Sequence, residues 1–151
     1  IYKEFTEEKL FVRTNHDTKL QMLVYLVNSL FKNSKLKESL LYTEQLRSAM
    51  EEYQRMYYDK YLFFYYNSLV INYSRLDRNR AIEILDEMKG NEKIVSNPFY
   101  EMFVYLNLAV SWFDKKDFHQ SIRNLNKLYL LKGYENADRS LQFKMLAGVN
   151  R

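Results

Sequence analysis

The chain has 151 residues, no Cys and a formal net charge of +4. This length suits one globular domain, and the missing Cys excludes disulfides, thiol nucleophiles and thiolate metal sites. Apolar residues make up 47% and charged residues 28%, which is typical of a folded chain. Only 3 Gly and 1 Pro are present. A sheet protein of this size needs more turn residues, so we expect long helices joined by short loops.

Apolar residues recur at helical spacing through most of the chain. They predict a short helix over residues 1–12, a polar break at 14–17, and helices over 17–32, 35–53, 57–75, 77–89, 98–115, 117–132 and 138–150. Gly90 fits a left-handed residue after a helix end, and Gly133 closes the last full helix pair. Asn97 and Pro98 fit a helix N-cap followed by the first helical residue.

Three stretches of the chain align with one another without gaps. Residues 67–88, NSLVINYSRLDRNRAIEILDEM, align with residues 107–128, NLAVSWFDKKDFHQSIRNLNKL, at an offset of 40 residues. Residues 26–46, LVNSLFKNSKLKESLLYTEQL, align with residues 68–88 at an offset of 42 residues. The small residues Ser39, Ala81 and Ser121 fall in register. Each copy therefore predicts a hairpin of two helices.

A polar turn separates the two helices of each copy. Asp77 and Asp117 stand where a carboxylate accepts the free backbone N–H groups of the second helix, and Ser34 can do the same in copy one. Only a small side chain leaves room where two helices approach closely, so we expect Ala81 and Ser121 to face the first helix of their own hairpin.

The copies resemble the tetratricopeptide repeat. Leu108, Ala109, Trp112, Phe118, Ser121, Leu125 and Leu128 fill the family's large, small and aromatic positions in copy three. Leu26, Leu30, Leu36, Ser39 and Leu46 fill most of them in copy one. Copy two departs, because Ser68 and Arg78 stand at a large apolar and an aromatic position. The family period is about 34 residues, shorter than the period found here. The resemblance covers residues 20–132 and places Trp112 between the two helices of copy three.

The resemblance implies an all-α fold, an α–α superhelix (solenoid) of about three tetratricopeptide-like hairpins with flanking helices. The expected organisation is one helical-repeat domain over residues 1–151. It has a leading helix at 1–16, repeats at 17–56, 57–96 and 97–136, and a terminal helix at 137–151. Because the chain begins at Ile1 and shows no signal segment, we expect a piece of a longer cytoplasmic protein.

No pattern in the sequence predicts catalysis or a bound cofactor. His16 and His119 are the only imidazoles, and neither has a partner at triad spacing. No His, Asp or Glu cluster has the spacing of a metal site, and three scattered Gly cannot form a phosphate loop. The most apolar run, residues 61–73, is too short and polar to span a bilayer. We therefore predict a protein that is not an enzyme, binds no cofactor or metal and enters no membrane.

In the tetratricopeptide family the first helices line a concave groove. The resemblance implies a binding surface made of Asn28, Lys32, Phe63, Tyr66, Asn67, Phe103 and Asn107. The stretch at 57–66, YYDKYLFFYY, is either a helix covered by its neighbours or part of an aromatic groove. Asn67 and Asn107 either form core hydrogen bonds or bind the backbone of an extended peptide. Copy three lacks a cation here, so the family's clamp for a C-terminal carboxylate is expected to be absent.

These features predict a non-catalytic protein–protein interaction or scaffold module that binds a peptide or partner helix in its concave groove. A homo-oligomer is compatible with them. The alternatives are a helical-repeat nucleic-acid-binding domain and a regulatory sensor domain. Nucleic-acid binding is supported by a pI of about 9.1 and by basic residues at the turns, namely Lys32, Lys35, Lys37, Arg75, Arg78, Arg80, Lys115 and Lys116. Solvated loop charge explains these cations more simply, so nucleic acid is the less favoured partner.

Overall fold

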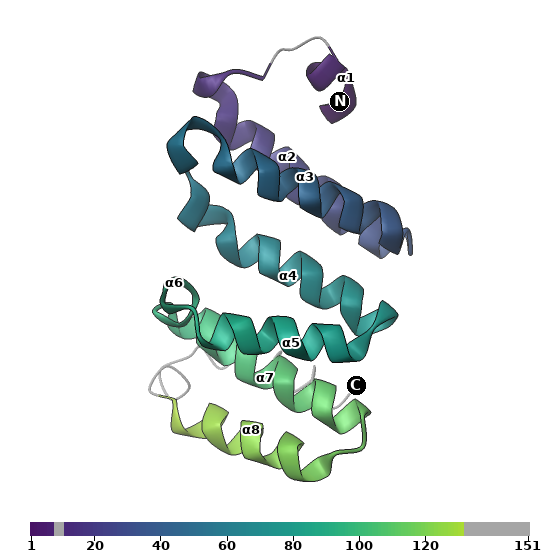
Figure 1. Ribbon diagram of the computed structural model, residues 1–151, viewed down its shortest axis with the longest axis vertical. Coiled ribbons are helices and arrows are strands. Elements are labelled where there is room, and N and C mark those ends of the chain that lie inside the picture. Colours follow the sequence, from purple (N-terminus) through teal and green to yellow (C-terminus); the bar gives the residue numbers. More distant parts are fainter. Residues whose placement is uncertain (8–10, 132–151) are drawn as a thin grey trace. The chain divides into compact units, whose positions relative to one another are not determined.

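The computed structural model describes residues 1–7 and 11–131, and every secondary-structure element in these residues is a helix (Figure 1). In chain order they are α1 (Tyr2–Glu7), the 3-10 turn η1 (Arg13–Asn15), α2 (His16–Lys32), α3 (Leu36–Arg55), α4 (Tyr58–Leu76), α5 (Arg78–Lys89), α6 (Glu92–Val95), α7 (Pro98–Asp114) and α8 (Phe118–Leu130). The prediction of an all-α chain is confirmed for these residues. The helix predicted over 138–150 and the helix end predicted at Gly133 lie outside them.

The predicted bounds of the six long helices agree with the structure to about two residues at each end, which is the usual uncertainty of a helix terminus. The sequence does not predict α6, because a helix of 4 residues is too short to show an apolar period. A local cap explains it: the Asn91 side chain accepts a hydrogen bond from the Lys93 backbone N–H at 3.0 Å. The α6 turn is therefore encoded by its cap.

The chain folds as two compact units, Ile1–Leu76 and Asp77–Arg151, and each is described by itself. Their boundary falls in the turn of the predicted second hairpin. The stacking of three hairpins into one domain and the solenoid therefore stay predictions.

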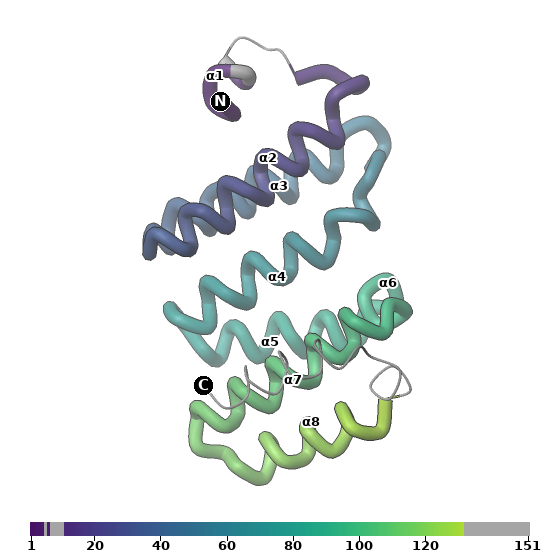
Figure 2. Tube along the Cα trace, turned by 180° about the vertical axis from the view of Figure 1, so that it is seen from behind, coloured from purple at the N-terminus to yellow at the C-terminus, as the bar shows by residue number. Residues whose placement is uncertain are grey.

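The core of the first unit is formed by α2, α3 and α4, which pack against one another. Figures 1 and 2 show α2 and α3 side by side and antiparallel. Their buried apolar side chains include Leu20, Leu23, Val27, Leu46, Met50 and Leu69. Each such side chain stabilises the fold by roughly 1.5–3 kcal/mol when fully buried. Burial of one apolar face per helix thus holds this unit together.

The second unit is built on α7, which packs against both α5 and α8. Its core includes Ile84, Leu85, Met88, Met102, Leu108 and Leu128, all almost fully buried. The helix α7 begins as predicted, since the Asn97 side chain accepts hydrogen bonds from the backbone N–H groups of Phe99 at 2.9 Å and Tyr100 at 3.3 Å. Pro98 occupies the first helical position, where its missing N–H costs nothing.

Two corrections concern single residues at helix ends. Gly90 has φ −88 and ψ 0, so the predicted left-handed glycine is wrong. Its N–H still donates to the Asp86 and Glu87 carbonyls, which keeps the backbone close to helical geometry before α6. Ser34 does not cap α3, because its φ of 61 places it in the left-handed conformation that ends α2. The N-cap of α3 is Lys35, whose side chain makes no cap bond.

The turn between α2 and α3 is a Schellman motif, in which a left-handed residue lets two backbone bonds close the helix end. The Ser34 N–H donates to the Phe31 carbonyl, and the Lys35 N–H donates to the Leu30 carbonyl, both at 2.9 Å. These bonds satisfy carbonyl groups that a helix terminus leaves without partners. The turn is therefore specified by backbone geometry and needs no glycine.

The turn between α7 and α8 repeats this geometry. Lys116 has φ 64, its N–H donates to the Phe113 carbonyl, and the Asp117 N–H donates to the Trp112 carbonyl, both at 2.9 Å. Asp117 also caps α8 as predicted, by accepting from the Gln120 N–H at 3.1 Å. The two turns correspond residue by residue at an offset of 82 residues, the offset between copies one and three.

In the α2–α3 and α7–α8 hairpins, a buried serine joins the two helices. Ser39 Oγ donates to the Val27 carbonyl at 2.9 Å, and Ser121 Oγ donates to the Ala109 carbonyl at 2.8 Å. In both hairpins the acceptor lies 12 residues before the serine. The prediction that Ser121 faces its own hairpin is confirmed. Ala81 is buried in α5, but its predicted partner helix belongs to the other unit, so that prediction stays open.

Ser39 also connects a third helix of the first unit. The Asn72 side chain of α4 donates from Nδ2 to Ser39 Oγ at 2.9 Å and to the Ser68 carbonyl at 2.9 Å. Ser39 and Asn72 are fully buried, and buried polar groups without partners are costly. The Ser39 hydroxyl therefore links α2, α3 and α4 at one point.

We expect Ser39→Ala to lower the free energy of unfolding by about 1–3 kcal/mol, because Asn72 Nδ2 loses a buried acceptor. The exposed Ser48 of the same helix provides the control variant, Ser48→Ala, which should change stability by less than about 0.5 kcal/mol. Urea denaturation of the three proteins measures the difference. Equal midpoints for both variants would contradict the proposed link between helices.

We expect Ser121→Leu to lower the free energy of unfolding by about 1–3 kcal/mol, since Leu overpacks the contact with α7. Asn126→Leu adds a Leu at an exposed position of the same helix and serves as control. Thermal denaturation followed by far-UV circular dichroism compares them. A melting temperature of Ser121→Leu equal to that of the control would contradict the close packing of Ser121 against α7.

Candidate functional site

The predicted binding residues lie on the first helix of each predicted hairpin. Asn28 and Lys32 are on α2, Phe63, Tyr66 and Asn67 on α4, and Phe103 and Asn107 on α7. All are half-buried except Lys32, which is exposed. The α2 and α4 groups belong to the first unit and the α7 group to the second, so the single groove predicted from them stays a prediction.

The aromatic stretch 57–66 divides into a covered and an open side. Tyr61 and Tyr65 are buried, which fits the interpretation of a helix covered by its neighbours. Phe63 and Tyr66 remain half-buried, and their rings lie 6.0 Å from Phe64 and 5.5 Å from Tyr65. One edge of α4 therefore presents aromatic surface, as the groove interpretation requires, while the opposite side is core.

A similar edge runs along α7. Phe99 is 50% exposed, and Phe103 and Asn107 follow at intervals of one helical turn, both half-buried. Asn107 Nδ2 donates to the Phe103 carbonyl at 2.8 Å. This donor supports its own helix, which favours a local structural role for the Asn107 nitrogen.

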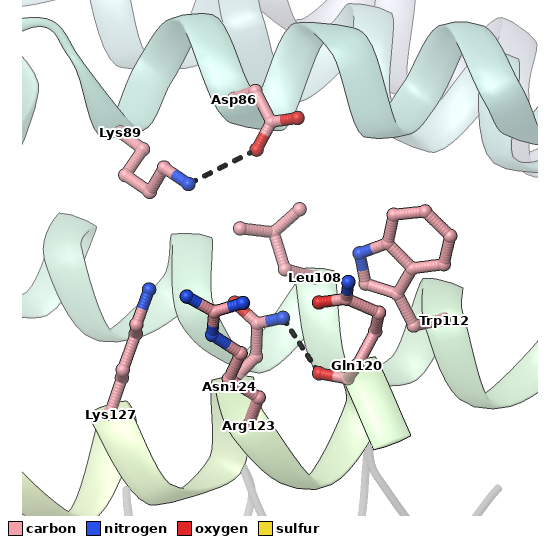
Figure 3. A pocket seen from close by; sticks show the side chains of 8 residues that line it. All are labelled: Asp86, Lys89, Leu108, Trp112, Gln120, Arg123, Asn124 and Lys127. Atoms are coloured by element: carbon pink, nitrogen blue, oxygen red, sulfur yellow. Dashed lines mark hydrogen bonds and ion pairs between the residues drawn. The ribbon is translucent and has the colours of Figure 1, made fainter. Parts of the chain in front are cut away.

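The structure contains a pocket that the sequence does not predict. It lies in the second unit between α5, α7 and α8 and has a volume of about 250 Å³ (Figure 3). Its walls are Asp86, Lys89, Leu108, Trp112, Gln120, Arg123, Asn124 and Lys127. Trp112 of α7 lines this pocket together with Gln120 of α8, and its side chain is half-buried. Its predicted place between the two helices of copy three stays a prediction, whereas the burial expected there is only partial.

Cations dominate the electrostatics of this pocket. Lys89, Arg123 and Lys127 line it together with one carboxylate, Asp86. Lys89 Nζ lies 3.4 Å from Asp86 Oδ1. Lys127 Nζ lies 6.0 Å from the centre of the Tyr105 ring, a distance that allows a cation–π contact. The pocket therefore carries a net positive charge.

The pocket has a sequence signal that apolar periodicity misses. Gln120, Arg123, Asn124 and Lys127 recur at the spacing that places side chains on one face of a helix. This polar period marks the stripe on α8. It does not indicate Asp86, Lys89 or Trp112, because these residues come from other helices.

Several of the basic turn residues contact groups of the chain itself. Arg78 pairs with Asp114, Arg80 lies 3.0 Å from Glu83, and the Arg75 guanidinium lies 4.4 Å from the Phe31 ring centre. Lys115 donates to Asn79 Oδ1 and lies 5.3 Å from the Trp112 ring centre. These contacts favour a structural role for the turn cations.

Of the two imidazoles, His119 is exposed in the first turn of α8, whereas His16 is buried at the start of α2. The exposed fraction of His16 is 1%. The Tyr53 ring meets it edge-on at 4.8 Å and the Tyr57 ring stacks at 6.5 Å. Tyr53 and Tyr57 have φ of 54 and 67, a left-handed conformation that non-glycine residues rarely adopt. The end of α3, which leaves helical geometry at Glu52, Tyr53 and Gln54, and the residue before α4 thus close over the imidazole.

Burial lowers the pKa of His16 below 6.5, because the cation loses its hydration. Glu52 and Asp17 and the Ala49 backbone oppose this shift, while Lys19 adds to it. The adjacent Asp17 accepts a 2.6 Å hydrogen bond from the Tyr61 hydroxyl. That bond, followed by the contacts with Lys60, lowers the pKa of Asp17 below 3.8.

The lowered pKa of His16 predicts a stability change in a defined pH window. In the unfolded chain the imidazole takes up a proton near pH 6.5, whereas in the folded chain it takes up a proton only at a lower pH. The free energy of unfolding should therefore fall as the pH drops from about 7 to about 5. Asp17 contributes only at lower pH, because its stabilising carboxylate is lost below its own pKa. Urea denaturation across this range measures the slope.

His16→Gln removes the titrating group and should flatten that slope, whatever its own effect on absolute stability. His119→Gln makes the same change at the exposed imidazole and serves as the control substitution. An identical slope in His16→Gln and the unchanged chain would show that His16 does not control this pH dependence.

Two features of the described residues concern metal binding and membrane insertion. Within residues 1–7 and 11–131, no group of three or more His, Cys, Asp or Glu side chains is placed to hold a metal ion. In the same residues no helix combines the length and the apolar character needed to cross a bilayer. The predictions on catalysis and cofactors stay predictions.

Comparisons of the chain with protein-family models, with curated proteins and with solved structures find no match. The resemblance to tetratricopeptide repeats therefore depends on the residues themselves.

Proposed function

We propose that this chain is a non-catalytic protein–protein interaction module of tetratricopeptide-like hairpins, which binds a peptide or a helix of a partner along the edges of its first helices. The correspondence between the α2–α3 and α7–α8 hairpins supports it, since both share the same Schellman turn and the same buried serine bond. Repeated hairpins of this kind stack to form extended binding surfaces.

The observation that carries the proposal is the open aromatic edge of α7. Phe99 and Phe103 retain accessible surface, although Met102, Val104 and Leu106 beside them are buried. Large aromatic side chains held on a rigid helix are the residues that most often dominate binding energy at protein interfaces. The edge of α4, with Phe63 and Tyr66, has the same character.

The alternative of nucleic-acid binding has less support. It needs cations that are available to phosphates along one edge, and four of the turn cations already contact the chain: Arg75, Arg78, Arg80 and Lys115. Nucleic-acid affinity also depends steeply on salt, falling about 1,000-fold or more between roughly 50 and 200 mM for six phosphate contacts. Salt dependence thus separates the two functions.

Substitution along the α7 edge tests the proposal. Phe99→Ser and Phe103→Ser should each weaken binding of a partner by about tenfold or more, because each removes an aromatic anchor. Phe113→Ser changes the same residue type on the same helix at similar exposure, 53% against 50% for Phe99, and should bind normally. Quantitative affinity capture finds candidate partners, and titration of a purified partner measures the affinities.

Melting temperatures must accompany these affinities. If Phe103→Ser unfolds the chain, the more exposed Phe99 carries the comparison alone. Partners that bind Phe99→Ser, Phe103→Ser and Phe113→Ser equally well would rule out the α7 edge as the binding surface.

A further inference from the structure

We propose that the pocket between α5, α7 and α8 is a carboxylate-binding subsite, which takes an acidic side chain of a partner peptide together with an apolar neighbour. The inference rests on the proposed interaction function and adds a specificity for acidic sequences.

The pocket holds positive charge that the chain does not neutralise. Of its three cations, Lys89 is paired with Asp86. For Arg123 and Lys127, no carboxylate in the part of the chain that the structure describes lies within ion-pair distance. A guanidinium offers paired N–H donors that match the two oxygens of a carboxylate. Arg123 is thus the group best suited to bind the acid.

The arrangement of α8 makes these cations unfavourable without an anion. Arg123 and Lys127 are four residues apart, and like charges at this spacing repel each other on a helix. Lys89 adds a third positive charge from α5. A bound carboxylate would offset this repulsion, and it would gain most from Arg123 and Lys127, since Lys89 is already paired with Asp86.

The Asn124 amide of the pocket is held in place. Asn124 is buried, and its Nδ2 donates to the Gln120 carbonyl at 2.9 Å. This bond fixes the amide within its own helix, so Asn124 does not have to reorganise when a ligand enters. Preorganised polar groups bind with a smaller entropic cost.

The shape of the pocket indicates what accompanies the acid. In the view of Figure 3 the cationic groups of Lys89, Arg123 and Lys127 lie toward one end, and Trp112 lies at the other. Leu108 lies between them. An apolar side chain next to the acid would contact Leu108 and the indole. The preferred sequence is therefore an acidic residue beside a large apolar one.

A carboxylate fits this pocket better than a phosphate does. Asp86 lines the same cavity, and its negative charge opposes a doubly charged phosphate more than a singly charged carboxylate. The cations also converge on one pocket of about 250 Å³, whereas nucleic-acid binding draws on cations that follow a backbone.

Trp112 is the only Trp of the chain and lines the pocket, so its fluorescence reports on occupancy. The probes are a capped pentapeptide with a central Glu flanked by Leu and its twin with Gln in place of Glu. The Glu peptide should change the Trp112 emission in a saturable way. The Gln peptide should bind about tenfold more weakly, the value of one charge-assisted hydrogen bond.

Two double variants locate the effect. Arg123→Gln with Lys127→Gln should remove the preference for the Glu peptide. Lys35→Gln with Lys37→Gln removes the same formal charge from exposed positions of the first unit and should keep it. Melting temperatures should show both variants folded, because none of these four side chains forms an ion pair within the described residues. In the α8 variant, relief of the repulsion between Arg123 and Lys127 opposes the loss of the Lys127 contact with Tyr105.

Three outcomes would overturn the inference. They are equal affinity for the two peptides, no response of the unchanged chain to either peptide, and tighter binding of inorganic phosphate or of a single-stranded oligonucleotide than of the Glu peptide. None of them affects the partner assay at Phe99 and Phe103. Conversely, the chain could prefer the Glu peptide while Phe99→Ser and Phe103→Ser bind partners normally. That result would reject the α7 edge as the binding surface and support the carboxylate subsite.

Discussion

The α2–α3 and α7–α8 hairpins depend on one contact, the hydrogen bond from a buried serine to a carbonyl 12 residues earlier. It requires a side chain small enough for two helix backbones to approach and a hydroxyl placed to reach the facing carbonyl. Ser39 and Ser121 meet both conditions. Because the bond fixes where the second helix crosses the first, it also decides which faces become core and which edges stay accessible.

The consequences differ between the two units. In the first, Asn72 extends the contact of Ser39 into α4, so three helices share one polar point within an apolar core. In the second, α8 is anchored to α7 by Ser121, and its polar stripe lines an open pocket to which α5 contributes Asp86 and Lys89. The same hairpin device thus supports a sealed core in one place and a charged pocket in the other.

The location of charge separates two groups of cations. The turn residues Arg78 and Arg80 are engaged by carboxylates nearby in the fold, and they fit stabilisation of the helix ends. Arg123 and Lys127 lack such partners within the described residues and line a concave surface. His16 adds a separate constraint, because its burial disfavours the charged imidazolium and lowers its pKa.

The sequence by itself determined the features that depend on neighbours along the chain. Helix bounds follow from apolar period, the caps at Asn97 and Asp117 from local side-chain chemistry, and the position of Ser121 from the register of the copies. Helix period cannot reveal which third helix completes a site. Tertiary structure alone decided that Trp112 lines a pocket with Asp86 and Lys89, that His16 is enclosed by Tyr53 and Tyr57, and that Ser34 ends a helix instead of starting one. These outcomes depend on the packing of distant segments and on backbone conformation, and neither is written in the spacing of residues along one helix.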